Sequence, residues 1–264
     1  MQLSLFSTNN KRRTIYLRDL LRELAFRDMK LRYKGSVMVI AWSLLNPLAQ
    51  LVVFGFVFRY VLPLNIPNYT AFLFCGLLVW SWFQSSLFAG TTTIVDGRSL
   101  IKRPGFPAAI LPVVIVMSNL IHFLLALPVL LIFLLVTGVP IHATILFLPV
   151  IITLQFILTL SLSYFLATFH VTFRDTQHLI GVILLLFFYL TPIFYDANIV
   201  PERFLFYYRL NPMFHVIDAY RAILIRGELP ALLPMVGLTA VSLILLVIGY
   251  RTFLKASYTF VEEL

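Results

Sequence analysis

Residues 110–136 read ILPVVIVMSNLIHFLLALPVLLIFLLV and contain no Asp, Glu, Lys or Arg. A helix needs about 20 apolar residues to cross the roughly 30 Å hydrocarbon layer of a bilayer, so this stretch is long enough to span a membrane. The rest of the chain has the same character, since 61% of its 264 residues are hydrophobic and 12% are charged. Because a helix satisfies its own backbone hydrogen bonds in lipid, the sequence predicts an all-α, polytopic membrane protein.

Further apolar runs on both sides of this stretch predict a total of about six transmembrane helices. Turn residues separate the runs, for example Gly138 with Pro140 and Gly227 with Pro230. The predicted spans cover residues 37–62, 69–89, 110–136, 145–169, 179–194 and 231–250. We therefore expect a single transmembrane domain over residues 37–264, preceded by a cytoplasmic N-terminal segment of residues 1–36.

The Lys and Arg residues are distributed unequally between the predicted loops. Fifteen of the 20 lie in residues 1–34, in the second and fourth loops and after the last span. Cytoplasmic loops carry the excess of Lys and Arg, so both termini are predicted to be cytoplasmic and the partner of this charge to be membrane lipid, not nucleic acid. Residues 1–34 lack the apolar core of a cleavable signal peptide, so the first span is expected to direct the chain into the bacterial inner membrane.

The end of the N-terminal segment has the pattern of an amphipathic helix. Helical spacing connects Leu17, Leu20, Leu21, Leu24 and Leu31, with basic residues between them. We interpret residues 15–34 as an interfacial helix that lies along the inner leaflet and leads into the first span. A simple positively charged tail is the alternative, but it accounts for the charge and not for the leucine spacing.

The connection between the last two spans, residues 195–230, is too long for a tight turn. It contains apolar residues on both sides of a break at Asn211-Pro212. Two short re-entrant or interfacial helices fit this pattern best. Because irregular backbone at membrane depth is tolerated only beside protein or a water-filled cavity, the connection predicts the mouth of a pathway.

The predicted spans contain no Asp or Glu, and His122 is the one deeply placed residue that can carry a charge. Proton- and sodium-coupled transporters usually need ionisable groups in the membrane, so secondary transport is disfavoured. None of the 11 glycines is followed by Lys, so the chain cannot form the Walker phosphate loop. Any ATP and Mg²⁺ are therefore expected on another polypeptide, with no cofactor in this chain.

A partner ATPase would need a cytoplasmic docking surface, and residues 94–109 are the candidate. This loop combines charged and apolar residues, namely Asp96, Arg98, Lys102 and Arg103 with Leu100, Ile101 and Phe106. An ordinary positively charged loop is the alternative interpretation.

Sequence motifs of enzymes are missing from the chain. The histidines follow no H-E-x-x-H pattern and the serines no G-x-S-x-G pattern, so neither a metal hydrolase nor a serine nucleophile is indicated. The single cysteine, Cys75, allows no internal disulfide and is expected to pack among apolar residues. A stand-alone membrane glycan enzyme that uses loop acids such as Asp175, Asp196 or Asp218 stays open as an alternative from a different class.

Aromatic residues make up 15% of the chain and gather at residues 80–83, 187–189, 194–195 and 204–208. Aromatic rings stack on the apolar faces of sugars, and Tyr and Trp add hydrogen bonds without fixed charge. Interfacial belts and helix packing also use aromatic residues, so both interpretations are kept.

Motifs occur in order along the chain. They are RDMKLRYKGS (27–36), WSLLNPL (42–48), LIK (100–102), FP (106–107), LP (111–112), FRD (173–175), TPIFY (191–195), LNP (210–212) and YR (220–221). The set resembles ABC-2 type permeases that export O-antigen, teichoic acid and related polysaccharides, over nearly the whole chain. Ala108-Ala109 departs from the family, which often has a charged residue there, and Pro104-Gly105 interrupts the same loop.

The resemblance implies a non-enzymatic permease that forms a homodimer, binds two copies of a cytoplasmic ABC ATPase and exports a glycan on polyprenyl diphosphate. It makes residues 94–109 the main coupling region, Arg174 and Asp175 a second contact, and residues 196–230 a periplasmic gate. Residues expected along an aromatic path are Trp42, Phe187, Phe188, Tyr189, Phe194 and Tyr195. Arg32 and Lys34 are candidates for attracting the diphosphate, although anionic phospholipid would attract them as well. Export of teichoic acid, a drug or a small lipid is the alternative within the family.

Overall fold

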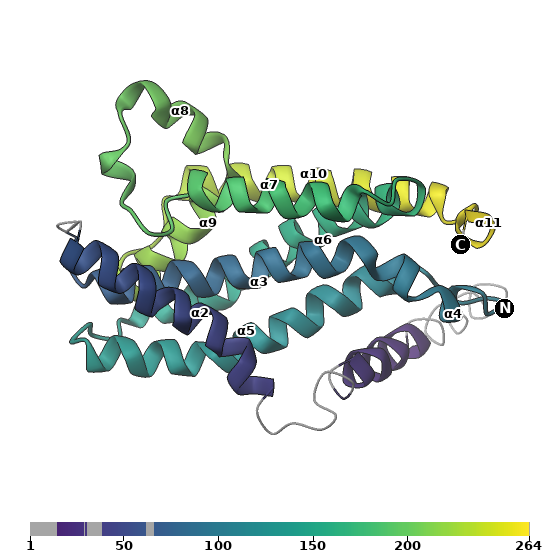
Figure 1. Cartoon of the computed structure of the whole chain (residues 1–264), viewed down its shortest axis with the longest axis horizontal. Helices are drawn as coiled ribbons and strands as arrows, with labels where there is room; N and C mark the ends of the chain where they lie inside the picture. Colours follow the sequence, from purple (N-terminus) through teal and green to yellow (C-terminus); the bar gives the residue numbers. More distant parts are fainter. Residues whose placement is uncertain (1–14, 29, 31–38, 62–65, 264) are drawn as a thin grey trace, which may run out of the picture.

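The computed structural model describes residues 15–28, 30, 39–61 and 66–263. Within these ranges all regular elements are helices and no strand is present, which confirms the predicted all-α fold. The long helices run side by side along the longest axis of the molecule (Figure 1). Their apolar surfaces face one another in the interior and cover much of the outside, as a bundle surrounded by lipid requires.

The bundle is built from six apolar helices. They are α2 (Val39–Phe56), α3 (Tyr69–Asp96), α5 (Ile110–Val136), α6 (Leu148–Thr172), α7 (Thr176–Leu190) and α10 (Leu232–Ala256). The π-helical turn η1 (Val57–Val61) follows α2, and the 3-10 turn η2 (Ala143–Phe147) precedes α6. Four of the six helices, α3, α5, α6 with η2, and α10, are long and apolar enough to cross a membrane, while the apolar parts of α2 and α7 are shorter.

Three predicted span ends differ from the helix ends by four residues or more. The second span was expected to end at residue 89 and the sixth at residue 250, but α3 continues to Asp96 and α10 to Ala256. The fifth span was expected to reach residue 194, but α7 ends at Leu190. Pro192 explains the earlier end, since proline disfavours the helical conformation of the residue before it.

Helix α3 is the centre of the bundle and contacts α2, α5, α6, α7 and α9 (Pro212–Arg221). Its apolar side chains are almost completely enclosed, among them Phe74 and Trp80, and Cys75 is buried there as expected. Helix α10 packs mainly on α6, where Gly249 allows a close approach of the two backbones. Small residues permit such contacts between membrane helices.

The two ends of the bundle carry different elements. At one end, which we call the inner end, lie the helix of residues 15–28, α4 (Arg98–Ile101) and α11 (Phe260–Glu263) (Figure 1). At the opposite, outer end lie η2, α8 (Glu202–Leu210), α9 and the π-helical turn η4 (Ala222–Arg226). The described segments that carry most of the Lys and Arg residues therefore share one end, as predicted. Assignment of this end to the cytoplasm remains a prediction.

The N-terminal amphipathic helix forms over residues 15–28. Its leucine face contacts the protein. Leu24 is buried in a hydrophobic cluster with Leu100 and Ile101, which we call the inner-end cluster, and Leu20 and Leu21 are partly buried against this cluster. The predicted continuation through Leu31 lies outside the described residues. The leucine spacing thus serves packing against the loop after α3, and contact with the inner leaflet remains a prediction.

Candidate functional site

The predicted coupling region forms a short, anchored projection at the inner end. Leu100 and Ile101 of α4 are buried in the inner-end cluster together with Phe253 and Phe260. Asp96, Arg98, Lys102 and Arg103 are exposed, and Phe106 is half-buried. The apolar residues of the loop thus fix its position in this chain, and the charged residues are the ones that another protein can reach.

An inner groove of about 450 Å³ separates the N-terminal helix from the loop after α4. Its lining includes the cations Arg27 and Arg103, the acid Glu23 and the aromatic residues Tyr16 and Phe106. None of the N-terminal helix residues in this groove had been expected at a site. Tyr16, Leu20 and Leu24 are four residues apart, which indicates that they share one face of the helix.

The second predicted contact is held by the C-terminal helix α11. Arg174 donates from Nη2 to the Glu263 carbonyl oxygen at 3.3 Å, and Thr172 donates to the Glu263 carboxylate at 3.1 Å. Phe260 anchors α11, since it is buried and its ring lies 5.2 Å from that of Phe253. This support was missed from the sequence because a helix of one turn gives no periodic pattern.

The structure brings the two predicted contacts together around one side chain. His170 of α6 is buried and close enough to Asp96 and Arg174 for both of their charges to act on it. Asp175 follows on the same loop and is exposed. The residues predicted from two separate loops thus lie at the same end of the bundle.

The predicted path residues meet in an aromatic cluster around Phe194. Its ring lies 5.9 Å from Phe188, 5.9 Å from Tyr189 and 4.9 Å from Tyr195. Phe54 of α2 and Phe58 of η1 complete the cluster at 5.6 and 5.4 Å from Phe194.

Four of the six expected path residues, Phe188, Tyr189, Phe194 and Tyr195, are in this cluster. Phe187 precedes Phe188 on α7, is exposed and is not part of the cluster. Arg32, Lys34 and the side chain of Trp42 lie outside the described part of the structure.

A groove of about 310 Å³ lies beside the aromatic cluster, between α2, α3 and α7. Its aromatic lining residues are Phe54, Phe188 and Tyr189, and the rings of Phe54 and Phe188 lie 6.0 Å apart. Gln50 and Gln84 are the polar residues of the lining, and the Gln84 side-chain oxygen accepts a hydrogen bond from Trp80 Nε1 at 2.9 Å. Gln50, Phe54 and Phe58 had been missed, although their spacing of four residues places them on one helix face.

The uncharged hydroxyl groups of Tyr195 and Tyr208 lie on the outer side of the aromatic cluster. Tyr195 donates to the Tyr189 carbonyl oxygen at 3.0 Å, and its hydroxyl lies 3.2 Å from that of Tyr208 in α8. Burial, and then the hydrogen bond to Tyr208, raise the pKa of Tyr195 above its ordinary value. The phenol is therefore neutral at physiological pH. The groove and its outer rim present rings, amides and hydroxyls, which are groups suited to a sugar chain.

The break predicted at Asn211-Pro212 joins the outer elements to the end of α7. Asn211 caps α9 by accepting the Met213 amide at 3.0 Å, and its side-chain nitrogen donates to Thr191 Oγ1 at 2.8 Å. The two predicted short helices, α8 and α9, are confirmed on either side of Asn211. The LNP motif at 210–212 and the TPIFY motif at 191–195, which are separate in the sequence, thus contact each other directly.

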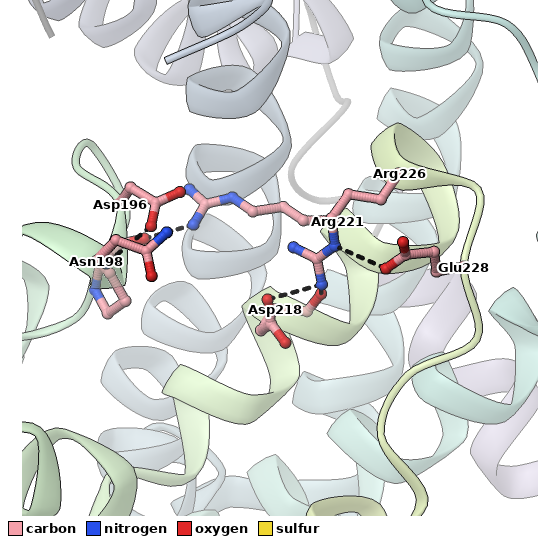
Figure 2. Close-up of polar contacts among 7 residues, drawn as sticks. Asp196, Asn198, Asp218, Arg221, Arg226 and Glu228 are labelled. Atoms are coloured by element: carbon pink, nitrogen blue, oxygen red, sulfur yellow. Dashed lines mark hydrogen bonds and ion pairs between the residues drawn. The ribbon is translucent and has the colours of Figure 1, made fainter. Parts of the chain in front are cut away.

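The acids considered for a glycan enzyme do not converge. Asp175 lies at the inner end, whereas Asp196 and Asp218 lie at the outer end. Asp196 accepts the Asn198 amide at 2.8 Å, and Asp218 pairs with Arg226 at 2.9 Å (Figure 2). The described residues hold no group of three or more His, Cys, Asp or Glu arranged for a metal ion.

A lipid-exposed helix bundle with a polar and aromatic groove, and with a charged projection at one end, has the architecture of a membrane permease. The family of ABC-2 type transporters matches residues 19–225, so the chain belongs to this family. It is 37% identical over 250 residues to the O-antigen export system permease protein RfbA of Myxococcus xanthus, covering 94% of this chain and 96% of the relative. The RfbA permease of Klebsiella pneumoniae is 35% identical over 254 residues, with the same coverage. The polysialic acid transport protein KpsM of Escherichia coli is 23% identical over 244 residues, covering 89% of this chain and 94% of the relative.

Proposed function

We propose that this chain is the membrane-spanning permease subunit of an ABC exporter that moves an O-antigen-like polysaccharide, linked to polyprenyl diphosphate, out of the cytoplasm. The observation that carries the proposal is the similarity to the O-antigen export permease of Myxococcus xanthus over nearly the full length of both chains. The neutral aromatic groove supports the same class of substrate, because rings and hydroxyls can hold successive sugars without binding any one of them tightly.

ATP hydrolysis takes place on a separate cytoplasmic subunit, which holds the ATP and Mg²⁺. The glycines of this chain cannot form a Walker loop, so the energy must come from a partner. The anchored α4 loop is suited to receive that partner, since Lys102 and Arg103 are exposed while Leu100 and Ile101 transmit force into the bundle. Arg174 and Asp175 extend the same surface.

The working transporter contains two copies of this chain and two copies of the ATPase. The groove between α2, α3 and α7 is open on one side, and α7 exposes a row of large apolar residues beside it. A second copy facing this side encloses a path between two such grooves. In this arrangement both termini are cytoplasmic and the inner end faces the ATPase.

Helix α3 connects the proposed docking surface to the path. It runs without interruption from Asp96, next to α4, to Tyr69 at the outer end. Along the way it contacts α7 and α9, which carry the aromatic cluster and the outer break. Closure of the ATPase on α4 therefore moves a rigid helix that reaches the whole length of the groove.

The diphosphate of the lipid carrier requires cations at the inner end. Arg27 and Arg103 line the inner groove and act together with Arg32 and Lys34, which follow the N-terminal helix in the sequence. Clustered Lys and Arg attract anionic headgroups, and the same cations bind ordinary anionic membrane lipids when no substrate is present.

Affinity purification of the tagged chain from its native membrane in mild detergent, with mass spectrometry of the bound proteins, tests the proposal. A stoichiometric ATPase with a Walker motif supports the permease assignment, and lipid-linked glycan in the same preparation supports the substrate. Folded protein that repeatedly lacks an ATPase would overturn the assignment and favour the stand-alone glycan enzyme. An ATPase with teichoic acid or a small lipid in place of the glycan would keep the transporter and change its cargo.

A further inference from the structure

Arg221 is a buried cation at the outer end that the proposed transport path does not use directly. It is the last residue of α9 and only 4% exposed. No ion pair joins it to a carboxylate among the residues that the structure describes, although Asp218 and Asp196 are near enough for their charges to act on it. An unpaired buried charge is costly, so its environment must supply other partners.

Main-chain carbonyl groups supply these partners. Nη1 of Arg221 donates to the Pro192 carbonyl at 2.6 Å, and Nη2 donates to the Ile193 carbonyl at 2.7 Å. Nη2 also lies 3.3 Å from the Phe72 carbonyl, and the guanidinium carbon lies 3.3 Å from the centroid of the Phe72 ring. Figure 2 shows the side chain extending from α9 toward the segment that carries Asp196, while Arg226 turns to Asp218 and Glu228.

Helix α3 is shaped to admit this guanidinium. A β-carbon on Gly76 would lie 2.8 Å from Arg221 Nη2 and 3.1 Å from the Ile193 carbonyl oxygen. The first distance is shorter than real β-carbon contacts and the second is tight, so a larger residue at position 76 must displace the guanidinium and press on the turn after α7. The glycine and the arginine are therefore parts of one arrangement.

The segment that Arg221 binds is the turn of residues 191–195, where α7 has ended before Pro192. Carbonyl groups at the end of a helix need donors from elsewhere. Asn211 holds Thr191 at one end of the turn, and Tyr69 donates to the Phe194 carbonyl at 2.9 Å at the other. Arg221 supplies two donors in the middle.

We infer that Arg221 is a positioning residue that fixes the 191–195 turn against α3, and so places Phe194 and Tyr195 at the outer side of the groove. The guanidinium suits this role because its donors point in fixed directions within one plane and its face stacks on an aromatic ring. A lysine ammonium can reach one carbonyl but cannot reproduce the paired contacts and the stacking together.

Accessibility of a thiol in the turn tests this inference. In a Cys75→Ala background, Ile193→Cys places a reporter at a fully buried position. In the detergent-solubilised protein, where both ends are accessible, we expect Arg221→Met to increase its rate of labelling by a water-soluble maleimide at least tenfold, and Arg221→Lys to increase it less. Gly76→Ala with Arg221 intact is also expected to increase the rate. Arg226→Gln, which removes the two neighbouring exposed ion pairs with Asp218 and Glu228, is the matched control and is expected to leave the labelling rate unchanged.

A second reporter distinguishes a released turn from a protein that fails to fold. Ala167→Cys lies at a fully buried position of α6 toward the inner end, and its labelling is expected to stay slow in every variant. Unchanged labelling of Ile193→Cys in Arg221→Met would overturn the inference. Equal increases at both reporters would overturn it too, because Arg221 would then support the whole bundle and not the turn.

The consequence for transport rests on the proposed function. We expect Arg221→Met to reduce glycan export at least tenfold at an unchanged level of membrane protein, with partial recovery in Arg221→Lys. The labelling experiment needs neither ATPase nor glycan, so a failed positioning role and a failed transporter assignment give different results.

Discussion

A β-carbon on Gly249 of α10 would lie 2.9 Å from the carbonyl oxygen of Ser161 in α6. The Phe165 ring would also be within 3.0 Å, so the two helices are in contact at this point without space for a methyl group. The close approach fixes α10, whose other faces are mostly exposed, on the rest of the bundle.

Gly249→Ala is therefore expected to destabilise the protein. Overpacking costs about 1 to 3 kcal/mol, and the gain in helix propensity returns up to about 1 kcal/mol. Gly237→Ala is the matched control on the same helix, because its β-carbon would meet nothing within 4 Å. Thermal unfolding in detergent measures the difference, and equal midpoints for the two variants would contradict the close α6 contact.

Phe260→Ala is expected to release α11 from the loop that carries Arg174. Removing a buried phenylalanine costs about 3 to 5 kcal/mol, more than a one-turn helix can recover through two surface hydrogen bonds. Limited proteolysis should then show faster tryptic cleavage after Arg174. Tyr258→Ala, at an 85% exposed position, should leave the cleavage rate unchanged. Slow cleavage in both variants would show that α11 does not hold the loop.

Charge reversal of Lys102 and Arg103 to Glu is expected to weaken ATPase binding at least tenfold. Both side chains are exposed at the tip of the α4 loop, so their replacement alters the surface without removing packing. Arg251→Glu with Lys255→Glu changes the net charge equally on exposed positions of α10 and is the control. Co-purification of the ATPase measures the effect, and equal retention by both double variants would remove α4 from the docking surface.

Tyr189→Ala is expected to reduce glycan export several-fold with little change in protein level. Its side chain is 51% exposed and lines the groove, so the ring is available for stacking and contributes little to the core. Leu190→Ala changes the next residue, which has a similar exposure of 53% but does not line the groove. Export per molecule of membrane protein is the measurement. Matched losses in the two variants would indicate a general effect of truncating α7.

Much of the fold follows from the sequence where turn residues bound an apolar run. Residues 110–136 were predicted as one span and form α5 with the same bounds, because Pro107 and Gly138 stop the helix on each side. The predicted end of the fifth span was wrong because the apolar residues continue to Phe194, although Pro192 stops the helix. A prediction from hydrophobicity alone extends the helix through such a proline.

The candidate site was only partly predictable for a different reason. Phe188, Tyr189 and Phe194 stand out as aromatic residues, and the structure brings them together. Arg221 belongs to the YR motif at 220–221, but its burial was not predicted, because a basic residue in a connection between spans is ordinarily exposed. Its burial depends on carbonyl groups supplied by residues about 30 and 150 positions away, a combination that no local pattern encodes.

The short length of α7 has a further consequence for the surrounding lipid. Its 15 residues rise about 22 Å at 1.5 Å per residue, which is less than the roughly 30 Å of a bilayer core. The 191–195 turn continues the chain with carbonyls that Arg221 and Tyr69 already satisfy. We expect the membrane to accommodate this hydrophobic mismatch by becoming thinner beside α7. A thinner membrane along the open side of the groove would shorten the apolar distance that a polar, lipid-linked chain has to cross.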